Sequence, residues 1–514
     1  MVRDNGLASL WLRNIPTNSN TQVEPPAEVH FSGLRFTPDS NYFYFNRSDP
    51  GNPDLFFLYR APLLGGTPQK LLSDVDSNIT FSPDGKQFAY MRHDDPERGK
   101  YQLLIHSVEA GTEKVLVSGP TSENLYDPAW SPDGRTIICQ MYDFANGLIR
   151  LVAIDGTTSQ RKIIYSSNER SFFKASWLPD GSGLLGLVRE QNTNFTRNQI
   201  GFISYPQGVY SPITRDTNSY SDLSVAVSGH IVATVQNEPH WNLQVMPAGG
   251  SEDQVRQLSL VDQGTNFTWT SDNKLISDHA NVLNVVNLSS GDKTQLTGQM
   301  TGGEPWLCAP KGDIVFLKFS NGTQTIWRID SSGANLKQIT NGKQDTTPIC
   351  SPDGKWVYFL DRSGESKVER VPIDGGQRQV ISDLPFSGAA DISPDGKIVA
   401  FPTLEHSGER KERLALVEPG ADKPARVIDF ERSRAGLLRF ARDGKAVVYP
   451  VRENGIDNLW SQPLDGSKGK AITNFRAERI YDFHWSLDGK QLALVRGHTD
   501  ADVVLIRDQQ PQPQ

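Results

Sequence analysis

Residues 81–90 read Phe81-Ser82-Pro83-Asp84-Gly85-Lys86-Gln87-Phe88-Ala89-Tyr90, a pattern that predicts two short strands joined by a tight turn. Pro83 presets φ for the second position of a type I turn, and Asp84 suits the next position because its carboxylate accepts backbone N–H groups. Gly85 tolerates the positive φ of a three-residue hairpin with a bulge. From Lys86 onward polar and apolar residues alternate, which is typical of a strand with one buried face.

The same turn recurs along the whole chain. Further copies begin at Phe36, Trp130, Trp177, Trp269, Cys308, Cys350, Ile392, Phe440 and Trp485, and a degenerate copy begins at Val225. Successive copies start 39 to 49 positions apart. That period is typical of the four-stranded blade of a β-propeller. We therefore expect an all-β protein made of tandem β-propellers with four-stranded antiparallel blades.

The number of copies predicts more than one propeller. Eleven turns and a leading half unit make about twelve repeat units, whereas a single propeller usually has about four to eight blades. Two propellers of six blades are the simplest division, and seven plus five is the alternative. The shortest spacing, from Trp269 to Cys308, contains a Gly-rich segment. We place the N-terminal propeller at 1–300 and the C-terminal propeller at 301–508, with a half-blade at 1–30 that can complete the second propeller and a disordered tail at 509–514.

The bulk composition excludes two classes of partner. The 514-residue chain has a formal net charge of −8, whereas nucleic-acid binding needs clustered Lys and Arg. No apolar run is long enough to span a membrane, and no apolar signal-peptide core follows Met1. We expect no nucleic-acid partner, no membrane insertion by this chain itself, and a soluble protein without a signal peptide.

Two of the three cysteines occupy equivalent positions in successive repeats. Cys308 and Cys350 stand where other repeats have Phe, Trp, Val or Ile. We expect both to be small buried hydrophobic residues, because free cysteine behaves in this way in protein cores. A disulfide between neighbouring blades is the alternative. No cysteine spacing resembles a zinc site.

The repeated turn aspartates recur too regularly to be catalytic. Each is predicted to satisfy backbone N–H groups of its own turn, a structural role. This set comprises Asp84, Asp133, Asp180, Asp353, Asp395, Asp443 and Asp488. The chain also lacks the motifs of kinases, phosphate-binding loops and serine hydrolases. We therefore predict no catalytic residue, no metal ligand and no cofactor.

The loops after the second strand of each repeat are the predicted binding surface. In a propeller they emerge on one face around the channel mouth, and loops on a rigid scaffold usually carry binding sites. The alternative is that the charged residues of these loops are only solvated and bind no ligand. The predicted binding residues are His93, Asp94, Asp95, His279, His406, Arg452 and His498, within a wider set of Asp49, Asp54, Arg98, Arg189, Glu190, His240, Asp278, Asp361, Arg362, Glu405, Glu453 and Arg496. Most aromatic residues stand at turn-anchor or strand positions, which favours core packing over glycan binding.

The repeats resemble PD40 (TolB-type, WD40-like) repeats over nearly the whole chain. A narrower resemblance rests on Ser9-Leu10-Trp11-Leu12-Arg13, Asn18–Val23, Leu58-Tyr59-Arg60, Gly65–Pro68 and Asp502–Ile506. These segments are similar to the C-terminal propeller region of acidobacterial-type membrane serine/threonine kinases and winged-helix regulators. That resemblance implies a sensor or interaction module, with an effector domain and a membrane helix upstream of Met1. It also implies an extracytoplasmic or periplasmic location; without such an upstream part the chain is expected in the cytoplasm.

Together these observations predict a non-catalytic binding or sensor module of a bacterial membrane signalling protein. It would recognise a protein, a peptide or a small ligand through loops on the propeller face. A TolB-like periplasmic interaction scaffold is the first alternative. The second is a metal-dependent, lyase-like propeller enzyme, because some propeller lyases with this repeat hold a divalent metal with histidines at the channel mouth. His93, His279, His406 and His498 stand in equivalent loops, but no short ligand spacing supports a metal site.

Overall fold

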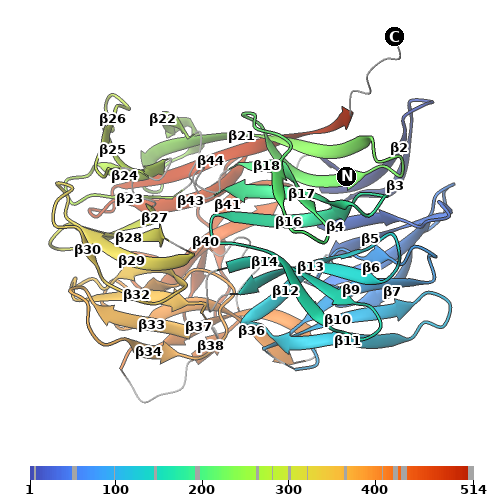
Figure 1. Cartoon of the computed structure of the whole chain (residues 1–514). Coiled ribbons are helices and arrows are strands. Elements are labelled where there is room, and N and C mark those ends of the chain that lie inside the picture. Colours follow the sequence, from blue (N-terminus) through green and yellow to red (C-terminus); the bar gives the residue numbers. More distant parts are fainter. Residues whose placement is uncertain are drawn as a thin grey trace, which may run out of the picture. The chain divides into compact units, whose positions relative to one another are not determined.

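The computed structural model describes the chain except residues 5–6, 49–54, 98, 144–147, 191–196, 262–265, 280–281, 299–301, 321, 364–366, 408, 421–425, 430–436 and 508–514. The described part consists almost entirely of strands, with one short 3-10 helix, η2 (Glu252–Gln254) (Figure 1). None of the described helices has the length and apolar character needed to cross a membrane. The predicted tail at 509–514 and the candidates Asp49, Asp54 and Arg98 lie outside the described residues.

The chain forms two compact units. Unit 1 contains Met1–Asp143, Leu148–Glu238 and the residues from Asp500 onward, and unit 2 contains Pro239–Thr499. The chain enters unit 2 within strand β21 (Ile231–Pro247) and leaves it within strand β44 (Gln491–Arg507). The expected boundary at residue 300 does not coincide with this division. The division falls inside continuous strands, where no Gly-rich or Pro-rich segment marks it.

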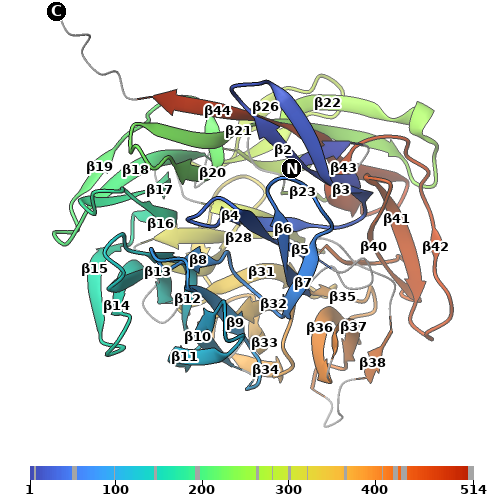
Figure 2. The same cartoon turned by 90° about the vertical axis from the view of Figure 1, so that its right-hand side faces the viewer.

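Unit 1 is a β-propeller built from antiparallel sheets that follow one another along the chain (Figure 2). Its sheets are β1 (Val2–Asp4), β2 (Leu7–Asn14), β3 (Ser19–Ala27); β4 (Phe31–Phe36), β5 (Tyr42–Ser48), β6 (Phe56–Pro62), β7 (Gln69–Ser73); β8 (Thr80–Phe81), β9 (Gln87–His93), β10 (Lys100–Ser107), β11 (Glu113–Pro120); β12 (Glu123–Trp130), β13 (Thr136–Asp143), β14 (Leu148–Asp155), β15 (Arg161–Ser167); β16 (Arg170–Trp177), β17 (Gly183–Glu190), β18 (Asn198–Ser204), β19 (Tyr210–Pro212); and β20 (Ser219–Val225) with β21 and β44.

Unit 2 repeats the same architecture. Its sheets are β23 (Phe267–Trp269), β24 (Leu275–His279), β25 (Val282–Val286), β26 (Lys293–Gln295); β27 (Gly302–Cys308), β28 (Asp313–Ser320), β29 (Thr323–Ile329), β30 (Lys337–Gln338); β31 (Asp345–Cys350), β32 (Trp356–Asp361), β33 (Lys367–Pro372), β34 (Gln379–Ser382); β35 (Asp391–Ile392), β36 (Val399–Ser407), β37 (Glu409–Val417), β38 (Arg426–Ile428); β39 (Arg439–Phe440), β40 (Ala446–Glu453), β41 (Ile456–Pro463), β42 (Lys470–Ala471); and β43 (Arg479–Trp485), β44, β21 and β22 (Arg256–Val261). The expected all-β tandem propeller is therefore confirmed.

The N-terminal residues belong to unit 1 and do not complete the second propeller as expected. Residues 2–27 form the three-stranded sheet β1–β3. Leu10 of β2 packs with Phe43, Phe45 and Ala61 of the next sheet. The apolar face of this sheet is thus buried within the first unit, which explains why it stays there.

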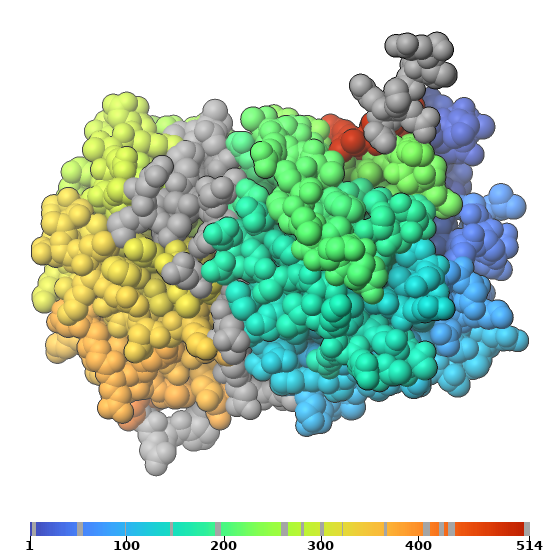
Figure 3. Space-filling model, viewed as in Figure 1, coloured from blue at the N-terminus to red at the C-terminus, as the bar shows by residue number. Residues whose placement is uncertain are grey.

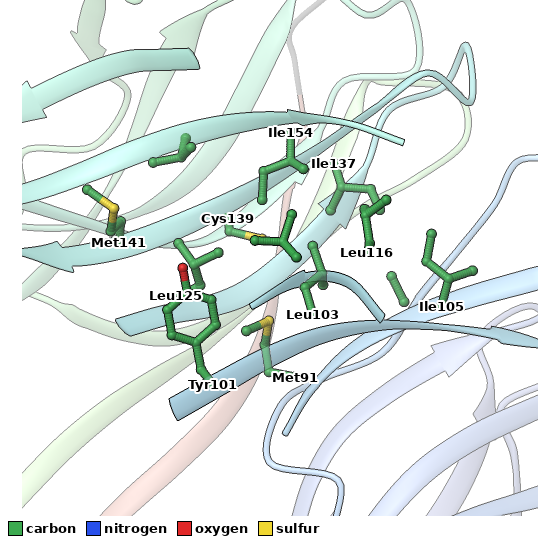
Figure 4. Close-up of a cluster of buried hydrophobic side chains, with 13 residues drawn as sticks. Met91, Tyr101, Leu103, Ile105, Leu116, Leu125, Ile137, Cys139, Met141 and Ile154 are labelled. Atoms are coloured by element: carbon green, nitrogen blue, oxygen red, sulfur yellow. The ribbon is translucent and has the colours of Figure 1, made fainter. Parts of the chain in front are cut away.

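Hydrophobic side chains fill the space between successive sheets. In the cluster of Figure 4, Met91 and Leu103 of the sheet β8–β11 meet Leu125, Ile137 and Cys139 of the sheet β12–β15. Figure 3 shows the residues of β12–β19, teal to green, at the surface of the face in view. Each sheet therefore buries its faces against its neighbours and exposes its outer edge.

The repeated turn also contributes to packing between sheets. Gly85 has a φ of 70°, and a Cβ placed on it would meet the ring of Pro38, in the preceding turn, at 3.4 Å. The same approach of a turn glycine to the proline of the preceding turn recurs at Gly134 and Pro83, Gly229 and Pro179, Gly354 and Pro310, Gly396 and Pro352, and Gly444 and Pro394. Glycine thus meets two requirements at this position, a left-handed backbone and a close neighbour.

Cys308 of β27 and Cys350 of β31 form a disulfide, with their Cα atoms 5.2 Å apart. The expectation that they are separate buried hydrophobic residues was wrong. Equivalent positions of neighbouring sheets face each other here, which brings the two side chains within bonding reach. Cys139 is buried and free.

Candidate functional site

Each unit carries an arginine at the same place in its repeat, partly buried in unit 1 and buried in unit 2. Arg35 of β4 and Arg439 of β39 both stand in a Leu-Arg-Phe sequence, one residue before the first residue of the repeated turn. In both, Nη1 donates to the carbonyl of the preceding leucine at 2.9 Å. The inner strand of one sheet in each unit thus presents a fixed guanidinium.

In unit 2 this arginine joins residues from several sheets. Nη2 of Arg439 lies 3.1 Å from Oδ1 of Asp482 and 3.0 Å from Nε2 of His484, both on β43. The guanidinium also stacks on Trp306 of β27, 4.8 Å from the ring centroid. Burial and the neighbouring arginine lower the pKa of His484, so this imidazole is neutral at physiological pH. The inner strands of unit 2 therefore meet in a polar network around Arg439.

Two carboxyl side chains, Asp278 of β24 and Glu304 of β27, lie beside this network; we call them the carboxyl pair. Nδ2 of Asn266 donates to Oδ2 of Asp278 at 3.2 Å, and the backbone N–H of Thr347 donates to Oε2 of Glu304 at 2.9 Å. A Cβ on Gly303, the residue before Glu304, would lie 3.4 Å from Oδ2 of Asp278, so the two strands approach closely.

The carboxyl pair is held in an unusual electrostatic state. Burial raises the pKa of Asp278 to about 7, and the neighbouring Glu304 adds to this shift. Burial also raises the pKa of Glu304. Oδ1 of Asp278 has no hydrogen-bond partner among the described residues. Near neutral pH Asp278 therefore exists in both protonation states, and a bound cation or hydrogen-bond donor would decide between them.

The backbone explains why Glu304 points into this cluster. Glu304 has a φ of 50°, and the pairing of β27 with β28 shifts its register between Gly303 and Trp306. Such a bulge leaves one residue unpaired and redirects its side chain. Equivalent bulges carry Asp127 and Lys174 in unit 1 and Thr347 in unit 2, all with positive φ.

The centre of unit 1 also carries charges, but they balance each other. Nζ of Lys174 lies 3.7 Å from Oδ1 of Asp222. Burial raises the pKa of Asp127, while the nearby Lys174 and Arg35 oppose this shift. Two cationic and two anionic side chains thus compensate one another. In the carboxyl pair of unit 2, the charges of Arg362 and Arg439 oppose the raised pKa of Glu304, whereas Glu304 and Asp482 add to the raised pKa of Asp278. Asp278 is therefore the better candidate for binding a charged ligand.

The predicted binding residues whose side chains are described belong to both units. In unit 1, Nε2 of His93 lies 3.1 Å from the carbonyl of Leu125, Asp94 accepts the N–H of Gly99 at 2.8 Å, and the carboxylate of Asp95 lies 4.0 Å from Arg92. In unit 2, Arg452 forms a bidentate pair with Asp457 at 2.6 and 2.8 Å. The side chains of His279 and His406 lie outside the described part of the structure.

His498 meets a residue that the sequence did not pair with it. The rings of His240 on β21 and His498 on β44 have centroids 5.1 Å apart. Asp500 follows two residues later on β44. Two adjacent imidazoles are side chains that zinc or manganese accepts as ligands, so His240 and His498 are the residues of unit 2 that would hold a metal.

Asp278 of the carboxyl pair is one of the loop residues named in the wider predicted binding set. Glu304 was not predicted from the sequence. Glu304 stands inside an inner strand, where the sequence pattern predicts core. The sequence contains a weak signal: Asp127, Lys174 and Asp482 are charged residues that each stand three positions before the first residue of a repeated turn. Glu304 does not match this spacing, because it stands four positions before Cys308, the first residue of its turn.

The seven turn aspartates have the contacts that a structural role requires. Each accepts a backbone N–H of its own turn; the acceptor–donor pairs are Asp84 with Lys86, Asp133 with Arg135, Asp180 with Ser182, Asp353 with Lys355, Asp395 with Lys397, Asp443 with Lys445 and Asp488 with Lys490. Hydrogen bonds from Ser82 and the Lys86 amide lower the pKa of Asp84.

No family model matches the chain, and no curated protein matches it in sequence. Among solved structures the chain is similar to the tricorn protease (TM-score 0.31, 12% identity, 89% of this chain and 47% of that chain). It is also similar to an oligogalacturonate lyase in complex with manganese (0.33, 12%, 80% and 96%) and to TolB from Acinetobacter baumannii (0.22, 14%, 81% and 77%). The chain thus spans less than half of the tricorn protease chain. These similarities concern the fold alone, and the resemblance to membrane kinases stays a prediction.

Proposed function

We propose that the chain is a non-catalytic binding module that recognises a positively charged group of a protein or peptide ligand at the carboxyl pair of unit 2. The observation that carries this proposal is the state of Asp278, whose Oδ1 has no partner among the described residues while Oδ2 is fixed by Asn266. A lysine or arginine side chain of a ligand would supply the missing partner. It would also stabilise the ionised form that burial disfavours.

Recognition fits this pair better than catalysis. One oxygen of each carboxyl group is already held by a protein donor, Asn266 for Asp278 and the Thr347 amide for Glu304. Such fixed oxygens orient the remaining ones toward a ligand. The neighbouring Arg439 contacts Asp482 and His484, and its charge, with that of Arg362, offsets part of the charge of Glu304. Asp278 is instead acted on by the negative charges of Glu304 and Asp482.

The test measures binding of a peptide array that contains Lys or Arg in varied contexts, followed by titration of the peptides that bind. Asp278→Asn and Glu304→Gln keep the shape of each side chain and remove its charge. We expect each to weaken peptide binding by at least about tenfold, equivalent to about 1.4 kcal/mol. Asp488→Asn, in a turn of the same unit, is the matched control and should bind like the wild type. Equal affinity of all four proteins would reject the proposal.

The sensor role within a bacterial membrane signalling protein is part of the proposal and rests on the sequence resemblance. The reading frame upstream of the Met1 codon tests it. An open frame that encodes a membrane helix and an effector domain supports the sensor role and an extracytoplasmic location. An export signal without an effector domain would instead favour a TolB-like periplasmic scaffold.

A metal-dependent propeller enzyme is the second candidate, favoured by the adjacent rings of His240 and His498. Metal analysis of the purified protein separates it from the first. Stoichiometric manganese or zinc that is lost in His240→Ala and His498→Ala, with peptide binding unchanged, would favour the enzyme. Absence of bound metal after dialysis against manganese would reject it.

A further inference from the structure

A second cluster of polar side chains lies in unit 1, on one face of the hairpin β12–β13. Asn124 pairs with Tyr142 across the two strands, and Tyr126 pairs with Gln140. Residues directly opposite each other in an antiparallel pair share a face, so these four side chains form one patch, which we call the polar face. The opposite face of the same hairpin carries Leu125, Cys139 and Met141, which pack into the apolar cluster of Figure 4.

The polar face contains buried hydrogen-bonding groups that the described residues do not fully pair. Gln140 is 3% exposed and Asn124 is 8% exposed. Oδ1 of Asn124 has no hydrogen-bond partner in the described part of the chain, and Nε2 of Gln140 forms no hydrogen bond of standard geometry there, although its side chain interacts with the hydroxyl of the neighbouring Tyr142. A buried donor or acceptor that stays unpaired costs about 1–3 kcal/mol, so a protein keeps such groups where another molecule pairs with them.

Aromatic rings surround these two amides. Tyr126 and Tyr142 pack edge to face with centroids 5.4 Å apart, and His93 stacks on Tyr126 at 5.2 Å. All three rings are partly exposed and form the accessible border of the polar face, whose two amides are buried. Nδ2 of Asn124 donates to the Tyr126 hydroxyl at 2.7 Å, which fixes the amide and turns Oδ1 to the other side.

The polar face itself is uncharged. Burial raises the pKa of Tyr126 to about 12 and also raises the pKa of Tyr142, so both hydroxyl groups are neutral at physiological pH. Asp143 and Arg150, next to the polar face, form their own ion pair at 2.9 Å. Charged side chains of both signs stand nearby, Asp76 and Asp94 acting on Tyr126, and Arg189 and Asp127 acting on Tyr142, so the surroundings do not favour an ion of one sign.

We propose that the polar face of unit 1 binds a neutral saccharide. The amide atoms of Asn124 and Gln140 match the hydroxyl groups of a sugar, which both donate and accept hydrogen bonds. The rings of His93 and Tyr126 offer a flat apolar surface for the C–H face of a sugar ring. This site goes beyond the proposed function, because it lies in the other unit and takes a different class of ligand.

The experiment screens the full chain against neutral mono- and oligosaccharides of glucose, galactose, mannose and N-acetylglucosamine by saturation-transfer NMR, and then titrates the saccharides that bind. Gln140→Leu and Tyr142→Phe remove hydrogen-bonding groups of the polar face with little change in volume. We expect Gln140→Leu to weaken saccharide binding by at least about tenfold. We also expect its melting temperature to change little, because the lost donor forms no hydrogen bond of standard geometry within the described part of the protein.

Gln462→Leu is the matched control. Gln462 is a buried glutamine of unit 2 whose Nε2 donates to the carbonyl of Ser467 at 2.7 Å. Its loss should lower the melting temperature and leave saccharide binding unchanged.

No binding of any neutral saccharide by the wild type, or unchanged binding in Gln140→Leu, would overturn the proposal. A lower melting temperature in Gln140→Leu with unchanged binding would assign Gln140 to a buried water instead. Asp278→Asn should leave saccharide binding intact, which separates this test from that of the proposed function.

Discussion

Arg439 is held by more groups than most arginines in the described structure. Asp482, His484, Trp306 and the carbonyl of Leu438 all contact its guanidinium. Although burial opposes it, the contacts with His484 and Arg439 hold the pKa of Asp482 below its usual value. Removing the arginine would leave the buried carboxylate of Asp482 without its arginine partner, which is costly.

We therefore expect Arg439→Met to destabilise unit 2 by about 3 kcal/mol. Chemical denaturation followed by tryptophan fluorescence measures this loss. Lys445→Met, at an exposed turn position of the same hairpin, serves as the control and should change stability by less than about 0.5 kcal/mol. A loss in Arg439→Met as small as that of the control would show that the network does not stabilise the fold.

The raised pKa of Asp278 predicts a pH dependence of stability. The carboxyl group has its usual pKa near 4 when unfolded and about 7 when folded, so the folded state binds more protons between these values. Its stabilising contribution is complete below about pH 4, falls as the pH rises and is lost above about pH 7. Asp391, whose pKa burial raises to about 6, acts in the same direction.

Asp278→Asn removes the larger of these two titrations. The difference in melting temperature, variant minus wild type, should increase by a few degrees from pH 5 to pH 8. The carboxyl group of the wild type ionises over this range, whereas the amide of the variant never does. Differential scanning fluorimetry of both proteins over this range measures the difference. A constant difference at all pH values would contradict the raised pKa.

At the scale of elements, the turn glycines are predicted to differ in importance. Gly354 has a φ of 67°, and a Cβ there would lie 2.5 Å from the carbonyl oxygen of Ala309 in the preceding turn. Gly181 has nearly the same φ, 72°, but nothing lies within 4 Å of such a Cβ. The two positions share the backbone strain and differ only in packing.

Gly181→Ala should therefore cost about 1 kcal/mol, from the left-handed backbone alone. Gly354→Ala should cost about 3 kcal/mol, because the preceding turn must also move. Denaturant unfolding of the two variants measures the comparison. Equal losses would mean that the close approach between turns is adjustable and that only the backbone conformation matters.

At the scale of the molecule, the C-terminal part of β44 belongs to unit 1. Val504 and Ile506 pack against the cluster that contains Leu187 and Leu223. Val503 and Leu505 alternate with them and are 74% and 40% exposed. The end of the chain thus supplies an outer strand to the unit in which the chain begins, which covers an edge of the sheet.

Replacing Val504 and Ile506 together by Asn should destabilise unit 1 by about 2–4 kcal/mol and leave unit 2 unchanged. The matched double replacement of Val503 and Leu505 should have little effect. Hydrogen exchange resolved along the chain distinguishes the units: protection should fall in β17 and β20 only for the first variant. Similar exchange in both variants would show that this strand does not stabilise unit 1.

The sequence by itself determined the repeat and therefore the fold class. The turn signature repeats because each hairpin needs the same backbone, and local sequence specifies local backbone directly. For the same reason the role predicted for the turn aspartates rests on contacts within a few residues of each. The division into units was not predictable in this way, because it falls inside β21 and β44, which carry no turn signal.

Only the tertiary structure placed Asp278 beside Glu304, His240 beside His498, and Cys308 within reach of Cys350. Each of these pairs joins different strands, so its proximity depends on how strands and sheets pack and on where bulges redirect a side chain. Burial, which raises the pKa of Asp278 and leaves Oδ1 of Asn124 without a partner in the described part of the chain, is likewise a property of the packed molecule. A sequence pattern records which residues alternate along a strand. It does not record which of them face one another after the sheets have packed.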